Sequence, residues 1–218
     1  MNDARQKILQ RLRRSHPPLP PLPDSQPAPA GGLPRQRRID TFCERLRSVR
    51  AEVHLTSPSQ WAERLLQLCR EKGLGNLLYA ADGPLAPAID AAWENADAPP
   101  ERISHAATIE QWKPTLFADT EAAVTSVRAG IADVGALVLW PTPQEPRSYS
   151  LVPPVHFAVL RADQFYHNFA EVVEQEQWHT GMPSNALLIS GPSKSADIEQ
   201  TLSYGVHGPT QLIVLLLV

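Results

Sequence analysis

The stretches Val155-His-Phe-Ala-Val-Leu160 and Leu212-Ile-Val-Leu-Leu-Leu-Val218 decide the fold class of this 218-residue chain. Both are short apolar runs without polar alternation, the pattern of strands that are covered on both faces. The pattern recurs in Asn76-Leu-Leu-Tyr-Ala80, Ala136-Leu-Val-Leu-Trp140 and Ala186-Leu-Leu-Ile189. Helical segments separate several of these runs. The sequence therefore predicts a layered α/β fold with a mostly parallel sheet.

The predicted helices rest on apolar residues at three- and four-residue spacing. Ile39, Phe42, Cys43, Leu46 and Val49, for example, fall on one helical face. Helices predicted in this way cover residues 39–49, 61–69, 85–94, 163–178 and 194–204, and a short strand is predicted at 52–55.

The first part of the chain differs in composition from the rest. Residues 3–14 predict a short helix, and the stretch Ser15 to Pro34 holds eight prolines and few residues that could pack a core. We therefore predict a basic N-terminal helix with a proline-rich linker at residues 1–37, followed by an α/β domain at residues 38–218.

Charge is unevenly distributed along the chain. Residues 1–40 hold eight basic and three acidic side chains, a balance of +5, and the remaining residues carry −8. The acidic domain argues against nucleic acid as the main ligand, since phosphate binding needs a basic surface. The basic leader is either a solvated helix or a segment that docks on the domain, on a partner or on an anionic polymer.

The cysteine count and the apolar runs exclude several protein classes. Cys43 and Cys69 are too few for a disulfide framework or for an iron–sulfur cluster. No apolar run approaches the roughly 20 residues of a membrane span, and the N-terminus lacks the apolar centre of a secretory signal. We expect a cytoplasmic protein with no metal site, no cofactor of its own and no membrane span.

Candidate binding residues lie in glycine-containing loops of the late sequence. The turn Gly130-Ile-Ala-Asp-Val-Gly135 precedes an apolar run, and Arg147 begins a loop that enters another. A guanidinium can hold a carboxylate or phosphate through two hydrogen bonds. Two glycines beside Asp133 predict a tight turn, either structural or close to a ligand. His156, inside an apolar run, is expected to be a core residue.

Two further loops complete the candidate set. Ser190-Gly-Pro-Ser193 leads from a strand into the helix predicted at 194–204, an arrangement that points backbone N–H groups at an anion. Asp197 and Glu199 lie near the start of that helix but diverge by about 200°, so they form no acid–base dyad. His207 sits in an exposed glycine-bracketed loop. The ligand-binding candidates are Asp133, Gly135, Arg147, Ser190, Gly191, Ser193, Asp197, Glu199, His207 and Gly208.

The strings GIADVGALVL (130–139), RSYSLVPPVHFAVL (147–160) and SNALLISGPSKSADIEQTLSYGVHGP (184–209) resemble, in order, the signatures of the lactate-utilization protein C family, the LUD domain. The resemblance implies a three-layer Rossmann-like fold similar to the sugar-phosphate isomerase, ribose-phosphate isomerase and CoA-transferase group. It also implies a role in converting L-lactate to pyruvate beside partner proteins that carry iron–sulfur clusters. Val134 and Ala136 stand where family members often have hydroxyl residues, which removes two hydrogen-bonding groups beside Asp133.

Two functions of different classes follow from these observations. The first is an accessory subunit of a lactate-oxidation system that binds a small organic acid, with the redox groups in its partners. The second is a stand-alone isomerase- or transferase-like enzyme acting on a phosphorylated or carboxylated small molecule, with Asp133 or Glu199 as base. A small-ligand sensor is a third alternative, which the lack of a DNA-binding motif disfavours.

Overall fold

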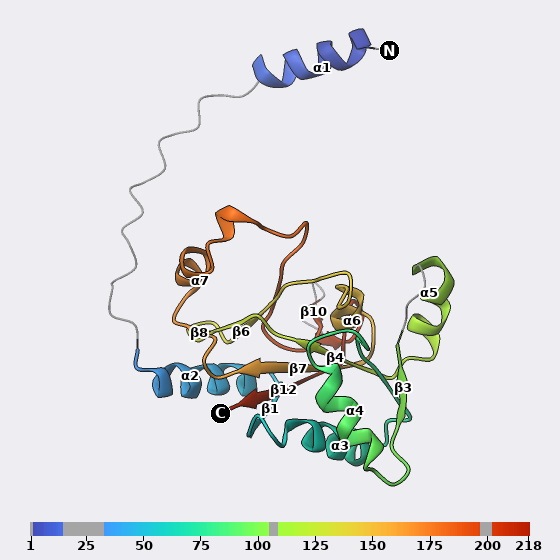
Figure 1. Ribbon diagram of the computed structural model, residues 1–218. Coiled ribbons are helices and arrows are strands. Elements are labelled where there is room, and N and C mark those ends of the chain that lie inside the picture. The colour runs from blue at the N-terminus through green and yellow to red at the C-terminus, as the bar shows by residue number, and fades with distance from the viewer. Residues whose placement is uncertain (1, 15–32, 105–108, 197–201) are drawn as a thin grey trace. The chain divides into compact units, whose positions relative to one another are not determined.

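The computed structural model describes residues 2–14, 33–104, 109–196 and 202–218 (Figure 1). The chain divides into two units, Met1–Gly32 and Leu33–Val218. The first unit contains helix α1 (Asn2–Arg14), as the sequence predicts. The second contains all the other described elements, beginning with α2 at Arg35. The domain boundary predicted at 37/38 stays a prediction.

The centre of the second unit is a six-stranded sheet with the order β1-β12-β7-β4-β2-β3. Every neighbouring pair is parallel, so the predicted α/β class with a mostly parallel sheet is confirmed. The two longest strands lie side by side in its interior, and Leu212 pairs with His156. The strands are β1 (Glu52–Thr56), β2 (Asn76–Leu78), β3 (Glu101–Ile103), β4 (Ala122–Ser126), β7 (Val155–Arg161) and β12 (Gln211–Leu217).

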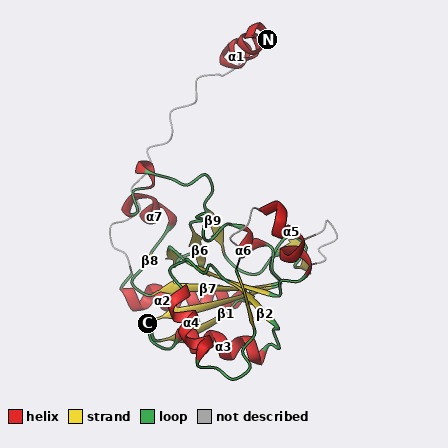
Figure 2. Cartoon of the chain, turned by 45° about the vertical axis from the view of Figure 1, so that its right-hand side comes forward, coloured by secondary structure: helices red, strands yellow, loops and turns green. Residues whose placement is uncertain are grey.

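Helices cover both faces of this sheet. The helices α3 (Trp61–Glu71) and α4 (Ala86–Glu94) bury their apolar side chains against one face, together with Phe157 and Leu215. The other face packs on α2 (Arg35–Ser48), α5 (Ile109–Ala118) and α6 (Ser148–Leu151). Figures 1 and 2 show α3 and α6 on opposite sides of the strands. None of the described helices is both long and apolar enough to cross a membrane.

A second sheet, with the order β8-β5-β6-β9, adds to the layer that contains α2. Its strands are β5 (Ala129–Ile131), β6 (Ala136–Leu139), β8 (Phe165–Tyr166) and β9 (Leu187–Ile189). The runs at 136–140 and 186–189 therefore lie outside the parallel sheet and pair antiparallel with each other. The run at 136–140 is apolar throughout because α2 covers one face of β6, and Val172 and Trp178 pack against the other, whereas Leu188 in β9 is 51% exposed.

The helix predicted over residues 194–204 is wrong. The described parts of this segment are two antiparallel strands, β10 (Lys194–Ala196) and β11 (Leu202–Tyr204). Long-range backbone bonds explain the difference, because the Ser193 N–H donates to Pro209 O (2.8 Å) and the Gly205 N–H donates to Ser193 O (3.0 Å). These bonds hold the flanking loops together, so the segments between them pair as strands.

The helix predicted over residues 163–178 is shorter in the structure. It begins only at Phe169, as α7 (Phe169–Gln175), because β8 occupies the start of the segment and Asn168 caps the helix. The Asn168 side chain accepts a hydrogen bond from the Glu171 N–H at 2.9 Å, which is typical of an N-cap residue. A single 3₁₀ turn, η1 (Trp178–Thr180), follows.

Candidate functional site

The carboxyl ends of the central parallel strands meet at one edge of the sheet and border a cavity of about 510 Å³, here called the carboxyl-end pocket. Ligands of open α/β sheets bind at this edge, in the crevice outside the strand ends. The volume lies in the range of small-molecule sites. The pocket is lined by Pro58, Trp61, Pro84, Leu85, Ala88, Ser126, Val127, Arg128, Trp140, Thr142, Val159, Arg161, Gln164 and Leu217.

Arg128 reaches the pocket from the loop that follows β4. Its Nε and Nη2 atoms both lie 2.6 Å from Glu176 Oε2. The guanidinium carbon lies 4.8 Å from the centre of the Trp140 ring, a cation–π distance. Tyr166 donates its hydroxyl hydrogen to Glu176 Oε1 at 2.5 Å. Glu176 and Trp140 together hold the Arg128 side chain in one orientation.

Arg161, the last residue of β7, brings a second guanidinium to the pocket. Its Nε and Nη2 atoms donate to the two carboxylate oxygens of Asp163, at 3.2 and 3.1 Å. These bonds hold the pKa of Asp163 below its usual range. More than half of each side chain is exposed, so this ion pair contributes little to stability and leaves Arg161 open to a ligand.

A buried carboxyl group stands behind the wall of the pocket. Glu145 is 9% exposed, and its Oε2 accepts hydrogen bonds from the Ser126 N–H (3.0 Å) and from the Ser126 hydroxyl (2.5 Å). Burial raises the pKa of Glu145, against the lowering effect of the two bonds from Ser126. The Glu145 N–H donates to Thr142 Oγ1 at 3.0 Å. Ser126 and Thr142, both in the pocket wall, are thus fixed by the same residue.

The structure brings two of the three predicted glycine loops together. Ser193 and Pro209 share a backbone bond, and a Cβ atom on Gly208 would lie 3.3 Å from Ser193 Cβ. The loops lie beside the amino ends of β7 and β12, where Pro154 O accepts bonds from both the N–H of Gln211 and the hydroxyl of Thr210. They therefore border the opposite edge of the parallel sheet from the carboxyl-end pocket.

The third loop, around Asp133 and Gly135, packs against α2. Gly135 has φ +61°, and a Cβ atom there would lie 2.4 Å from the Cβ of Arg45. Gly191 approaches the end of the same helix, since its Cβ would lie 2.9 Å from Val49 Cγ2. Both glycines are therefore required by close contacts with α2. The Asp133 N–H donates to His167 O at 3.0 Å, and its side chain is exposed.

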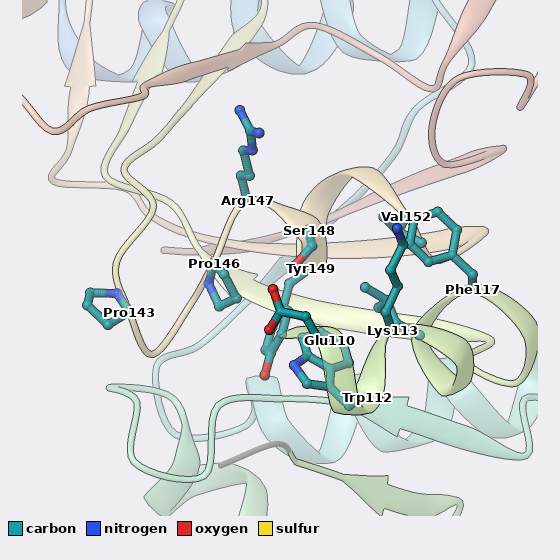
Figure 3. A pocket seen from close by; sticks show the side chains of 11 residues that line it. Glu110, Trp112, Lys113, Phe117, Pro143, Pro146, Arg147, Ser148, Tyr149 and Val152 are labelled. Atoms are coloured by element: carbon teal, nitrogen blue, oxygen red, sulfur yellow. The ribbon is translucent and has the colours of Figure 1, made fainter. Parts of the chain in front are cut away.

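Arg147 is exposed at the N-terminal end of α6 and borders a second cavity of about 570 Å³ between α5 and α6. Figure 3 shows its side chain extending away from the wall formed by Trp112 and Tyr149. The C-terminal end of α6 meets the Gly208 loop, since a Cβ on Gly208 would lie 3.6 Å from Leu151 O.

The remaining candidate residues differ in whether the structure describes them and in how exposed they are. Asp197 and Glu199 lie outside the described residues. Ser190 and His207 are exposed. His156 is a core residue, as predicted, with no exposed surface. Its Nε2 lies 2.9 Å from Thr125 Oγ1, and burial lowers its pKa to about 3.

Sequence reasoning missed the residues of the carboxyl-end pocket. Arg161 directly follows the apolar run at 155–160, and this position marks the carboxyl end of a predicted parallel strand. That signal was sufficient to find Arg161. The sequence signal for Arg128 is weaker, because the small residues Ala122-Ala-Val-Thr-Ser126 of β4 do not stand out as an apolar strand.

In the described part of the chain, no three His, Cys, Asp or Glu side chains are grouped to hold a metal ion.

Known proteins resemble this chain in sequence and in fold. The chain is 38% identical over 182 residues to the uncharacterized protein NMB1437 of Neisseria meningitidis, covering 82% of this chain and 76% of that protein. It is 31% identical over 93 residues to lactate utilization protein C of Exiguobacterium sp., covering 41% of this chain and 40% of that protein. A crystal structure of a DUF162 family protein from Deinococcus radiodurans matches with a TM-score of 0.58 and 21% identity, over 85% of this chain and 99% of that one.

The structural match confirms the predicted α/β fold. The family model of the LUD domain matches residues 39–217, which include every described strand. The similarity extends well beyond the late-sequence strings from which the family resemblance was inferred. This chain belongs to the LUD domain family.

Proposed function

We propose that this protein acts in lactate utilization, as a ligand-binding accessory subunit for the oxidation of L-lactate to pyruvate by iron–sulfur partner proteins. The observation that carries the proposal is the carboxyl-end pocket, where two arginines and the hydroxyl of Thr142 offer hydrogen-bond donors to a small organic acid. Family membership and the partial similarity to lactate utilization protein C support the biological process.

The oxidation of lactate removes two electrons, and protein side chains need a cofactor to accept them. The two cysteines of this chain are unpaired and buried in different core clusters. Burial raises the pKa of the Cys69 thiol to about 12 and also raises that of Cys43. Both remain neutral thiols near pH 7, which suits a reducing compartment such as the cytoplasm and supports placing the redox groups in the partners.

Growth of the native cells tests this role. Cells that lack this gene are expected to grow normally on pyruvate and poorly on L-lactate, and the intact gene should restore growth. A gene carrying Arg128→Ala together with Arg161→Ala should fail to restore it, whereas Arg70→Ala, on the far part of α3, should succeed. Normal growth on L-lactate without the gene would contradict the proposal.

Metal and flavin analysis of the purified chain tests whether the redox groups lie in the partner proteins. We expect no stoichiometric iron or flavin in the isolated protein, and iron in the material that co-purifies with it from lactate-grown cells. Iron near four atoms per isolated chain would contradict the assignment of the clusters to partners.

A stand-alone enzyme is the second candidate. Glu145 favours it, because a buried carboxyl with a raised pKa beside a pocket is typical of a general acid or base. Under this alternative, the isolated chain turns over a phosphorylated or carboxylated substrate, and Glu145→Gln abolishes turnover without loss of folding. Turnover that depends on added partner proteins would instead favour the accessory role.

A further inference from the structure

We infer that the carboxyl-end pocket binds a small molecule with two anionic groups, larger than lactate, with one group at Arg128 and the other at Arg161. The inference rests on the pocket that the proposed function uses and specifies its ligand. The class includes dicarboxylic 2-hydroxy acids, whose first carboxylate and hydroxyl match those of lactate.

Among the residues that the structure describes, the two arginines have the same edge without a partner. A guanidinium has five N–H groups in a fixed plane. In both residues the Nε and Nη2 edge is taken by a carboxylate of the chain itself, Glu176 for Arg128 and Asp163 for Arg161. The edge formed by Nη1 and the second Nη2 hydrogen remains for a ligand. It offers two parallel hydrogen bonds, the geometry that a carboxylate or phosphate accepts.

The charge around the pocket selects for anions. Of the described residues that line it, the charged ones are Arg128 and Arg161. The domain that contains them is acidic overall, so a generally basic surface does not explain why two arginines line this pocket. Each guanidinium is paired with one carboxylate of the chain and keeps a second edge for a ligand, so a molecule with two anionic groups can engage both arginines, whereas a molecule with one carboxylate engages only one.

The size and the walls of the pocket point to the same class. A volume of about 510 Å³ exceeds what lactate fills, since a water molecule accounts for about 30 Å³ of liquid and lactate has only six heavy atoms. Trp61, Leu85 and Val159 give the wall an apolar part, which fits a carbon skeleton between the anionic groups. Gln164 adds a side-chain amide to the hydroxyls of Ser126 and Thr142.

Titration of the full-length protein with matched ligands tests the inference. The diacids are L-malate, L-2-hydroxyglutarate and L-2-hydroxyadipate. Each has a monoacid control with a methyl group in place of the second carboxylate: 2-hydroxybutyrate, 2-hydroxyvalerate and 2-hydroxyhexanoate. Calorimetry gives the dissociation constants. We expect at least one diacid to bind about 10- to 100-fold more tightly than its control, the value of one additional charge-assisted contact.

Variants then locate the two contacts. Arg128→Ala and Arg161→Ala should each abolish the advantage of the diacid over its monoacid, and lysine at either position should restore only part of it. Arg70→Ala, whose guanidinium bonds Asp97 O at a remote site, should leave the advantage unchanged. Thermal melting of each variant tests whether it is folded. The inference is supported if both arginine variants are folded and both lose the preference for the diacid.

Three outcomes would overturn the inference: diacids that bind no more tightly than their controls, an advantage that survives both substitutions, or an advantage that is lost in Arg147→Ala instead. The binding assay uses the isolated protein, so its result is independent of growth on L-lactate. Tight binding of a diacid without a growth defect would refute the proposed function alone, and a growth defect without selectivity for diacids would refute this inference alone.

Discussion

His156 is an uncharged histidine in the middle of the core. It has no exposed surface, its Nε2 is bonded to Thr125, and its Nδ1 has no hydrogen-bond partner within the described parts of the chain. A proton on this ring would be buried without a neighbouring counter-charge, which is why its pKa falls to about 3. In the unfolded chain, the ring is hydrated and titrates near pH 6.5.

The pH dependence of stability should reveal His156. Between pH 6.5 and 3 the unfolded state binds the proton and the folded state does not, so the free energy of unfolding decreases as the pH falls. The contribution is roughly 1.4 kcal/mol for each pH unit within that window. Urea denaturation at pH 7, 6 and 5 should show a shallower slope for His156→Gln than for the unmodified protein.

The exposed His207 supplies the matched control for this experiment. His207→Gln should keep the full slope, because its ring is hydrated in both states. Comparing variants also cancels the opposite contribution of Glu145, whose raised pKa favours the folded state in acid. Equal slopes for His156→Gln and the unmodified protein would refute the prediction.

At the scale of elements, the contact between the β5–β6 turn and α2 depends on Gly135. We expect Gly135→Ala to lower the free energy of unfolding by about 2–4 kcal/mol, since a left-handed alanine costs about 1–2 kcal/mol and a clash with Arg45 adds to it. Gly73→Ala is the control, because Gly73 has a similar φ of +65° and nothing within 4 Å of its Cβ position. Chemical denaturation measures both, and equal losses would show that the contact with α2 is unimportant.

The sequence predicts strands well but not their partners. The runs at 155–160 and 212–218 are apolar because helices cover both faces of the parallel sheet, and the pattern records that burial. The run at 136–140 is buried in the same way but lies in a different sheet, where it pairs antiparallel with the less buried run at 186–189. Periodicity contains no information on pairing direction. The hairpin β10–β11 was missed because the bonds of Ser193 with Pro209 and Gly205 are long-range.

The same limit explains what was missed in the site. The glycine-containing loops are candidates from their residues alone, but the end of the sheet at which such a loop lies depends on the direction of its strand. The loops at 190–193 and 205–209 meet at the amino ends of β7 and β12. Arg161 lies at the carboxyl end and needed only the direction of its own strand, which the chain order of a parallel sheet provides.

At the scale of the whole molecule, the unit Leu33–Val218 should be stable without the leader. Every buried apolar side chain that the structure describes lies in this unit, beginning with Ile39. We expect deletion of residues 1–32 to leave the melting temperature within about one degree, because no described core residue is lost.

A longer deletion, through Arg38, provides the contrast. Arg35 Nε donates to Ala162 O at 2.8 Å, and Arg38 Nη1 donates to Phe165 O and pairs with Glu171. Removing these residues should lower the melting temperature by several degrees, since the hydrogen bonds and the ion pair that join the start of α2 to Ala162, Phe165 and Glu171 are lost. Scanning calorimetry gives the melting temperature of both deletion proteins. A markedly lower melting temperature after deletion of residues 1–32 would refute the prediction that residues 33–218 are stable alone.

The strand order also constrains how the protein is made. In the parallel sheet, β1 has one neighbour, β12, and Glu52 pairs with Ile213, about 160 residues later. At a synthesis rate of roughly 5–20 residues per second, β1 leaves the ribosome roughly 8–30 seconds before its partner does. Throughout that interval β1 lacks its partner, and once β7 has emerged, its edge toward β12 is unpaired as well. Newly made chains should therefore depend on chaperones during translation, and a ribosome stalled before residue 211 should present an aggregation-prone product.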